Sequence, residues 1–160
     1  MGLFSSTDAT HFPPVSGVRM DGGPFDLPDA LGAATLVVLS FGDDAAPLAG
    51  QWARLGARLA SHAPGLDVLD LVVVPPRLKL VGDLALIGVR ARAEAAGTQA
   101  QTAVAYAKPK AIRKALGVGR GDVAALLLGP DGAIAWRGDG EIDLHEVEAL
   151  EPAVAALLGT

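Results

Sequence analysis

The chain has 160 residues, of which 51% are hydrophobic and 19% charged, a composition typical of one globular domain with a sizeable core. The formal net charge is -5 and the Lys and Arg residues are scattered, which argues against a nucleic-acid partner. The chain contains no cysteine, so disulfide exchange, cysteine-based peroxide reduction and thiolate metal sites are chemically excluded.

Targeting segments are not apparent in the sequence. Met1 to Phe12 contains no Lys or Arg and no apolar run, so we expect neither a secretory signal nor a transit peptide, and we expect a cytoplasmic protein. The apolar stretch Leu66 to Val74 is interrupted by two Asp residues and is much shorter than the roughly 20 residues of a membrane-spanning helix. The sequence therefore predicts no transmembrane segment.

The first elements that the sequence predicts are a short hairpin and a buried strand. Val15 to Met20 and Gly23 to Leu27 flank Asp21-Gly22, a dipeptide typical of tight turns between strands. Leu36 to Phe41 is a continuous apolar run, typical of a strand buried on both faces of a parallel sheet. We therefore expect an N-terminal hairpin that extends a central sheet.

An amphipathic helix is predicted from Ala49 to Ala63. Its apolar face repeats at spacings of three and four residues and contains Trp52, Leu55, Leu59 and His62. We interpret His62 as a histidine of the core or its boundary rather than a ligand. Pro64-Gly65 ends the helix, and Leu66 to Val74 predicts a second buried strand.

The stretch Arg77 to Glu94 predicts a helix whose apolar arc is too wide for an ordinary surface helix. Two interpretations remain open. The helix is either buried against the sheet or contacts a membrane surface, an amphipathic partner or a second copy of the chain. In the second interpretation, the contact residues are Leu80, Leu84, Ile87 and Arg90.

Further along the chain, Thr102 to Tyr106 predicts a third short strand, and Lys108 to Leu116 predicts a basic helix that ends at Gly117. This helix contains the main concentration of positive charge, which we interpret as a solvated helix face. The four basic residues are Lys108, Lys110, Arg113 and Lys114.

The last third of the sequence predicts an antiparallel hairpin followed by a helix. Val123 to Leu128 and Ala133 to Arg137 are the two strands, and a Gly-Pro-Asp-Gly turn joins them. Asp143 is placed to cap the final helix, in which Pro152 is expected to cause a kink or a fresh turn. The order of elements predicts one α/β domain over residues 1–160, with a central mixed sheet flanked by helices and a flexible segment at 1–11.

The segment after the first buried strand has an unusual composition. Thr35 to Phe41 leads directly into Gly42-Asp43-Asp44-Ala45 and then into the start of a helix. This arrangement resembles the active-site strand and turn of thioredoxin-type proteins, which place a CxxC motif where the helix end lowers the thiol pKa. The matching positions here are Ala46 and Ala49, with Pro47 and Leu48 between them.

Other motifs extend the resemblance over nearly the full chain. They are Arg113 to Val118, the hairpin Leu126 to Gly140 with its Ile134 and Trp136 pair, and Glu146 in the last helix. On these residues the chain resembles the thioredoxin/peroxiredoxin-like proteins, and within them the cysteine-free assembly factors of the mitochondrial ATP synthase membrane sector and their bacterial relatives.

The resemblance implies a thioredoxin-like fold with a peroxiredoxin-style insertion. It also implies a redox-inactive protein with a binding, chaperone-like or assembly role at a membrane, and a membrane-complex subunit as its partner. Active thioredoxins carry a cis-proline before the strand that faces CxxC, whereas the nearby positions here are Asp122, Val123 and Ala124. We therefore expect no enzyme activity that depends on this groove.

Two alternatives remain. A cysteine-independent enzyme would have to use Asp43, Asp44 and His62, although adjacent Asp residues before a helix are typical of capping. His11, His62 and His145 lack metal-ligand spacing, so we expect no metal and no cofactor. The other alternative is a structural homodimer formed through the wide apolar helix. Trp52 either packs in the core or adds to an apolar surface around the vacated active site.

Overall fold

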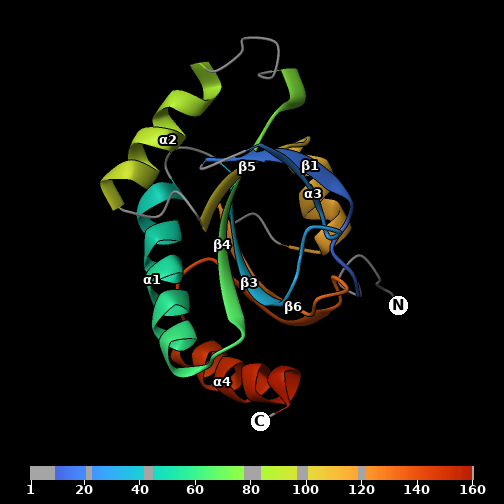
Figure 1. Cartoon of the computed structure of the whole chain (residues 1–160), viewed down its shortest axis with the longest axis vertical. Coiled ribbons are helices and arrows are strands. Elements are labelled where there is room, and N and C mark those ends of the chain that lie inside the picture. Colours follow the sequence, from blue (N-terminus) through green and yellow to red (C-terminus); the bar gives the residue numbers. More distant parts are fainter. Residues whose placement is uncertain are drawn as a thin grey trace.

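In a computed structural model, which describes residues 10–20, 23–41, 45–77, 84–96, 101–118 and 122–159, seven strands form one mixed sheet in the order β2-β1-β5-β4-β3-β6-β7 (Figure 1). The strands are β1 (Val15–Arg19), β2 (Pro24–Leu27), β3 (Ala34–Ser40), β4 (Leu66–Val74), β5 (Thr102–Tyr106), β6 (Val123–Leu128) and β7 (Ile134–Asp139). The helices of the described chain are α1 (Ala46–His62), α2 (Leu84–Ala96), α3 (Pro109–Leu116) and α4 (Leu144–Leu158). The predicted α/β fold with an N-terminal hairpin is confirmed.

The centre of the sheet consists of β3, β4 and β6. β3 pairs in parallel with β4 and antiparallel with β6, and every residue of β3 and of β6 is buried. Continuous apolar runs are typical of strands that helices or loops cover on both faces of the sheet. β5 continues the sheet beside β4 in parallel orientation, and the antiparallel β1–β2 hairpin extends it on that side.

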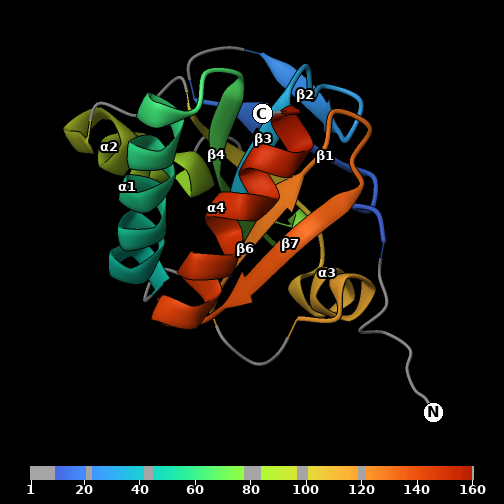
Figure 2. The ribbon, with the colours of Figure 1, turned by 90° about the horizontal axis from the view of Figure 1, so that it is seen from below.

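Alternate residues of the strands divide the core into two layers. Leu36 and Val38 of β3 pack with Trp52 of α1 and Leu150 of α4. The residues between them, such as Val37, face the layer that includes α3 and the β1–β2 hairpin. α2 covers a smaller cluster on the same face of the sheet as α1, and Figure 2 shows α1 and α4 together, separate from α3.

The predicted starts of two helices need correction, and the last helix is one helix across Pro152. α1 begins at Ala46 rather than Ala49, because Pro47 in its first turn has a backbone angle suited to a helix start. Arg77, the predicted start of the second helix, lies in a short 3₁₀ turn instead; α2 is described from Leu84 onward, and residues 78–83 lie outside the described chain. α4 continues through Pro152 as one helix, whose N-cap is Asp143 as predicted. The Oδ1 atom of Asp143 accepts a 2.8 Å hydrogen bond from the backbone nitrogen of His145.

The first described residues, Thr10 and His11, contact the chain at the start of β7. The backbone nitrogen of Ile134 donates to the Thr10 carbonyl oxygen over 2.8 Å, and His11 forms an isolated bridge with Ala133. The predicted flexible segment therefore does not include Thr10 and His11, and residues 1–9 lie outside the described chain. Among the described residues, none of the helices has both the length and the apolar run needed to cross a bilayer.

Candidate functional site

The positions that the sequence analysis matched to a CxxC motif, Ala46 to Ala49, lie at the start of α1. Ala49 is buried in the core beneath the helix, Pro47 is exposed and Leu48 is half-buried. Ala46 is the first residue of α1, and its side chain lies outside the described part of the structure. The N-cap, Ala45, makes no side-chain hydrogen bond to the helix. None of these side chains can ionise or act as a nucleophile, so the start of α1 presents apolar groups where thioredoxins present thiols.

α3 and β6 are joined to the end of β3 by one arginine. The guanidinium carbon of Arg113 lies 4.5 Å from the centroid of the Phe41 ring, and its Nη2 atom lies 3.5 Å from Asp122 Oδ1. The backbone nitrogen of Phe41 also donates to the Asp122 carbonyl oxygen over 2.9 Å. The prediction of a solvated basic face is therefore wrong for Arg113, whose side chain is only 26% exposed. The three lysines of the cluster are exposed as predicted.

Trp52 is a core residue that joins α1 to the C-terminal part of the fold. Its side chain is 0% exposed, and its Nε1 atom donates a 2.8 Å hydrogen bond to the carbonyl oxygen of Gly140. The Trp52 and Trp136 ring centroids are 6.0 Å apart, with the planes tilted by 58°. This geometry is typical of a favourable aromatic pair. Of the two interpretations of Trp52, core packing is the one observed, so its ring is not part of a surface.

Gly138, two residues after Trp136, lies where there is no room for a side chain. A Cβ atom at this position would lie 2.7 Å from Cη2 of Trp136 and 3.1 Å from Cη2 of Trp52. It would also lie 3.2 Å from Oε2 of Glu146, the residue of the last helix that the sequence analysis named as part of the resemblance. Trp136 and Glu146, two of the residues that carry the family resemblance, therefore lie beside Gly138, where a larger side chain does not fit.

Ser40 is a feature that the sequence analysis did not identify. It is the last residue of β3, its side chain is 0% exposed, and its hydroxyl oxygen has no hydrogen-bond partner in the described structure. Alternation along β3 places it on the same face as Leu36 and Val38, beneath α1. A buried hydroxyl without a hydrogen-bond partner is unfavourable. The sequence of the apolar strand does not indicate that the Ser40 hydroxyl lacks a partner among the described residues.

Of the residues considered for a cysteine-independent enzyme, His62 is the one that lies in the described chain. His62 is exposed, which corrects its predicted place at the core, and it lies in the last turn of α1. The rise along the helix places it roughly 24 Å from Ala46. Asp43 and Asp44 lie outside the described chain.

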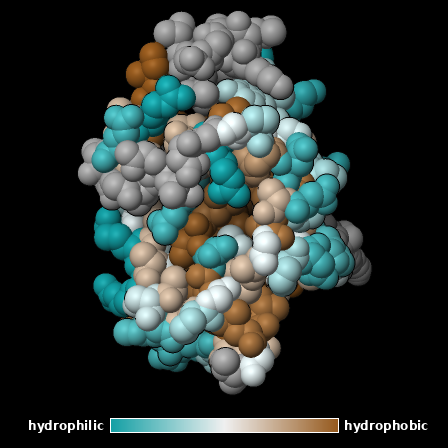
Figure 3. Space-filling model, in the orientation of Figure 1, coloured by the Kyte–Doolittle hydropathy of each residue, from teal (hydrophilic) through white to brown (hydrophobic). Residues whose placement is uncertain are grey.

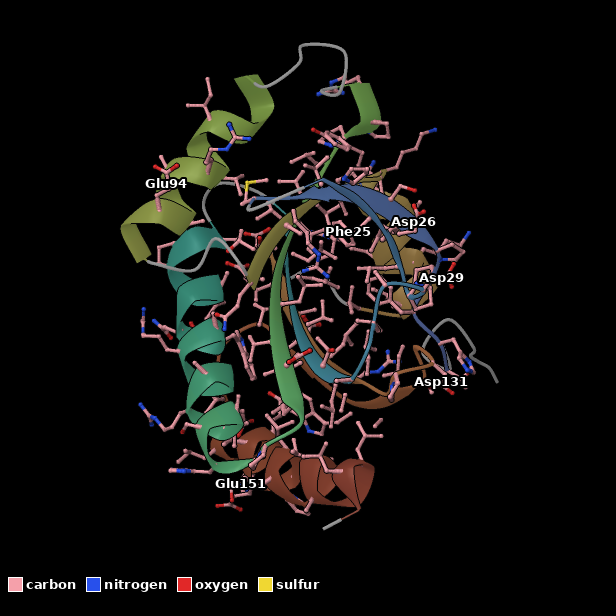
Figure 4. All side chains as sticks on the ribbon, viewed as in Figure 1. Phe25, Asp26, Asp29, Glu94, Asp131 and Glu151 are labelled. Carbon is pink, nitrogen blue, oxygen red and sulfur yellow. The ribbon has the colours of Figure 1, made fainter. Side chains whose placement is uncertain are left out.

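Acidic side chains are also dispersed over the molecule. Figure 4 shows Glu94 on α2 and Glu151 on α4, away from Asp26 and Asp29 near β2. Within the described residues, no group of three or more His, Asp or Glu side chains is placed to hold a metal ion.

The candidate contact residues of α2 have different environments. Ile87 is 55% exposed, whereas Val89 and Ala93 are buried against β4 and β5. Arg90 is half-buried. Leu84 belongs to α2, but its side chain lies outside the described structure, and Leu80 lies outside the described chain altogether. α2 therefore packs on the sheet with one face and presents Ile87 to the surroundings with the other.

No family model and no curated protein matches this sequence. Solved structures with similar folds include a thioredoxin-family thiol:disulfide interchange protein from Chlorobium tepidum, with 20% identity and a TM-score of 0.57 over 94% of this chain and 97% of that one. The thioredoxin domain of a thiol-disulfide oxidoreductase from Bacteroides vulgatus has 15% identity and a TM-score of 0.63, covering 91% of this chain and 96% of its own.

A thiol peroxidase from Chromobacterium violaceum is also similar, with 15% identity and a TM-score of 0.58 over 89% of this chain and 83% of that one. Similarity at these identities concerns the fold and carries no activity over to this chain. The oxidoreductases and the peroxidase are named for redox reactions, whereas this chain contains no cysteine. The protein therefore has a thioredoxin-like fold without the thiol chemistry of cysteine-based oxidoreductases.

Proposed function

We propose that this chain is a redox-inactive thioredoxin-fold protein that acts by binding another protein, as a chaperone-like or assembly factor. The observation that carries the proposal is the start of α1, where Ala49 fills the core, Leu48 is half-buried against it and Pro47 is exposed, with no reactive side chain among them. An apolar, partly exposed helix start of this kind suits contact with a partner and has no group for catalysis.

The exposed side of α2 is the second proposed contact surface. Ile87 is more than half exposed, and Arg90 is half-buried on the same helix. An exposed isoleucine with a neighbouring cation suits a partner helix or a membrane-associated protein. In this proposal Pro47, Leu48 and Ile87 contact the partner, and Trp52 supports the start of α1 from inside the core.

The proposal also names the class of protein that the chain binds. The resemblance to assembly factors of the ATP synthase membrane sector rests on Ile134, Trp136 and Glu146, of which the last two contact or approach Gly138. The packing of Trp136 and Glu146 around Gly138 is compatible with this resemblance, and we extend the resemblance to the class of partner. We propose that the partner is a membrane-complex subunit and that the chain binds it from the cytoplasmic side of the membrane.

Affinity capture from the native host, with and without detergent-solubilised membranes, tests this function. Subunits of one membrane complex should be retained by the wild type and lost by a Pro47→Glu, Ile87→Asp double variant, because both positions are exposed. Ala57→Asp is the matched control, since Ala57 is exposed on another part of α1. A retained subunit should then bind the purified chain directly.

Three results would contradict the proposal. Equal capture by the wild type and the double variant would remove both surfaces from partner binding. Turnover of a defined substrate by the purified chain would favour the enzyme alternative. Sedimentation that shows a stable dimer, lost in Ile87→Asp, would favour the homodimer alternative.

A further inference from the structure

Among the described residues, the first half of β4 has a strand partner on the side of β3 but not on the side of β5, and we call this place the gap. β3 pairs with β4 from Leu66 onward, but β5 pairs with β4 only from Asp70 onward. In the described chain, no strand pairs with residues 66–69 on the side of β5. A cavity of about 240 Å³ lies at this place. Figure 3 shows the molecule from the side of Figure 1, where the surface is hollowed near its centre.

Backbone groups of β4 point into the gap. The carbonyl oxygen of Val74 accepts a 3.0 Å hydrogen bond from Ala107, so Val74 directs its peptide groups toward the side of β5. Successive residues of a strand direct their N–H and C=O groups to opposite sides, so Val68 directs its groups to the same side as Val74. Val68 lines the cavity. The gap therefore presents a strand edge of the kind that pairs with an extended peptide.

Two opposite charges line the same cavity without pairing. Arg19 reaches it from β1 and Asp67 from β4, and neither forms an ion pair within the described part of the chain. The guanidinium carbon of Arg19 lies 5.2 Å from the centroid of the Phe25 ring, a contact that holds the cation in place without neutralising it. The exposed amide of Gln101 also lines the cavity. A ligand with one charge of each sign matches this lining.

We propose that this gap binds a short zwitterionic peptide of dipeptide length in an extended conformation. Its carboxylate pairs with Arg19, its ammonium group pairs with Asp67, and its peptide group bonds to the backbone of Val68. The edge of β4 that no described strand pairs with is four residues long, about 13 Å at the rise of a β-strand, and a dipeptide spans roughly half of that length. Leu31 and Leu69 line the cavity and can contact an apolar side chain.

This proposal is independent of the proposed partner binding. The gap lies at the amino ends of β3 and β4, whereas the start of α1 follows the carboxyl end of β3. The Pro47→Glu, Ile87→Asp variant should therefore bind the peptide as the wild type does. Failure of either proposal leaves the other unaffected.

Titration calorimetry of the full chain with alanyl-leucine, N-acetyl-alanyl-leucine and alanyl-leucine amide tests the proposal. The free dipeptide should bind saturably with one site. Each cap removes one charge and should weaken binding by about tenfold or more. Arg19→Gln and Asp67→Asn should weaken binding of the free dipeptide similarly. Arg58→Gln and Glu151→Gln make the same changes of charge at exposed positions outside the cavity and should leave the affinity unchanged.

Several outcomes would overturn the proposal. The first is the absence of saturable binding of the free dipeptide to the wild type. Another is equal affinity for the free and capped dipeptides, which would mean that neither charge is recognised. This comparison uses the wild type alone, so it stands even if a variant fails to fold. Wild-type affinity in both Arg19→Gln and Asp67→Asn would also overturn it.

Discussion

α1 and α2 lie on the same face of the sheet but are held there in different ways. α1 buries Ala49, Trp52 and Gly56 against the sheet, and Trp52 is bonded to the Gly140 carbonyl oxygen. α2 buries Val89 and Ala93, and its other described side chains are at least partly exposed. The sequence of α2 is the more uniformly apolar one, yet α1 is the more firmly packed. Close approach to the sheet, rather than apolar content, distinguishes a core helix from one that covers the surface.

The largest difference between the two helices should appear on truncation of Trp52. Trp52→Ala should lower the free energy of unfolding by about 3–5 kcal/mol, the cost typical of removing a large buried aromatic side chain. It also removes the contact with Trp136 and the donor to Gly140. Equilibrium denaturation in urea, followed by far-UV circular dichroism, measures the change.

Trp52→Phe is the control that separates packing from hydrogen bonding. It keeps an aromatic ring but leaves the Gly140 carbonyl oxygen without its donor, which costs about 1–3 kcal/mol when the group is buried. A loss for Trp52→Ala no greater than that for Trp52→Phe would mean that the ring itself contributes little. The start of α1 would then be less firmly held than its burial indicates.

Two helical glycines give a matched test of the comparison. A Cβ atom at Gly56 of α1 would lie 2.9 Å from Cδ2 of Leu36 and 3.2 Å from both Cγ atoms of Val68, whereas a Cβ atom at Gly88 of α2 would meet nothing within 4 Å. Gly56→Ala should therefore lower the free energy of unfolding by about 1–3 kcal/mol through overpacking. Gly88→Ala should raise it by about 0.5–1 kcal/mol, because alanine favours helix more than glycine does.

Thermal and urea unfolding of the two glycine variants measure these effects under the same conditions. Effects of equal sign would contradict the comparison. Stabilisation by Gly56→Ala would mean that Leu36 and Val68 move aside without loss, and that α1 packs no more closely than α2. Loss of stability in Gly88→Ala would mean that this part of α2 is covered in solution, as in a dimer.

Much of the fold follows from local sequence, whereas the site does not. Leu66–Val74, Thr102–Tyr106 and Val123–Leu128 are strands with the predicted bounds, because each is an apolar run between residues that end strands. The contact of Arg113 with Phe41 was not predicted, since it joins residues far apart in sequence. The gap beside β4 was not predicted either. It depends on where β5 begins to pair with β4, which no local pattern determines.

A smaller effect is expected for the hydroxyl beneath α1. Ser40→Ala removes a fully buried hydroxyl that has no hydrogen-bond partner in the described structure. The substitution should leave the free energy of unfolding unchanged or raise it by up to about 1 kcal/mol, because no bond is lost and the residue becomes apolar. If urea unfolding shows instead that Ser40→Ala lowers the free energy of unfolding, the hydroxyl forms a hydrogen bond, and the end of β3 has a polar role.

The smallest expected effect is that of a charge on the exposed side of α2. Ile87→Asp should change the free energy of unfolding by no more than about 0.5 kcal/mol, since the side chain is 55% exposed and isoleucine and aspartate have similar helix propensities. Val89→Asp is the control, because Val89 is buried against the sheet and an unpaired carboxylate there should strongly destabilise the fold. If Ile87→Asp is as destabilising as Val89→Asp in dilute solution, Ile87 belongs to the core. If its cost grows with protein concentration, Ile87 is covered by a second copy, because the wild type is then stabilised by association. Only a neutral Ile87→Asp leaves this side of α2 free for a partner other than a second copy of the chain.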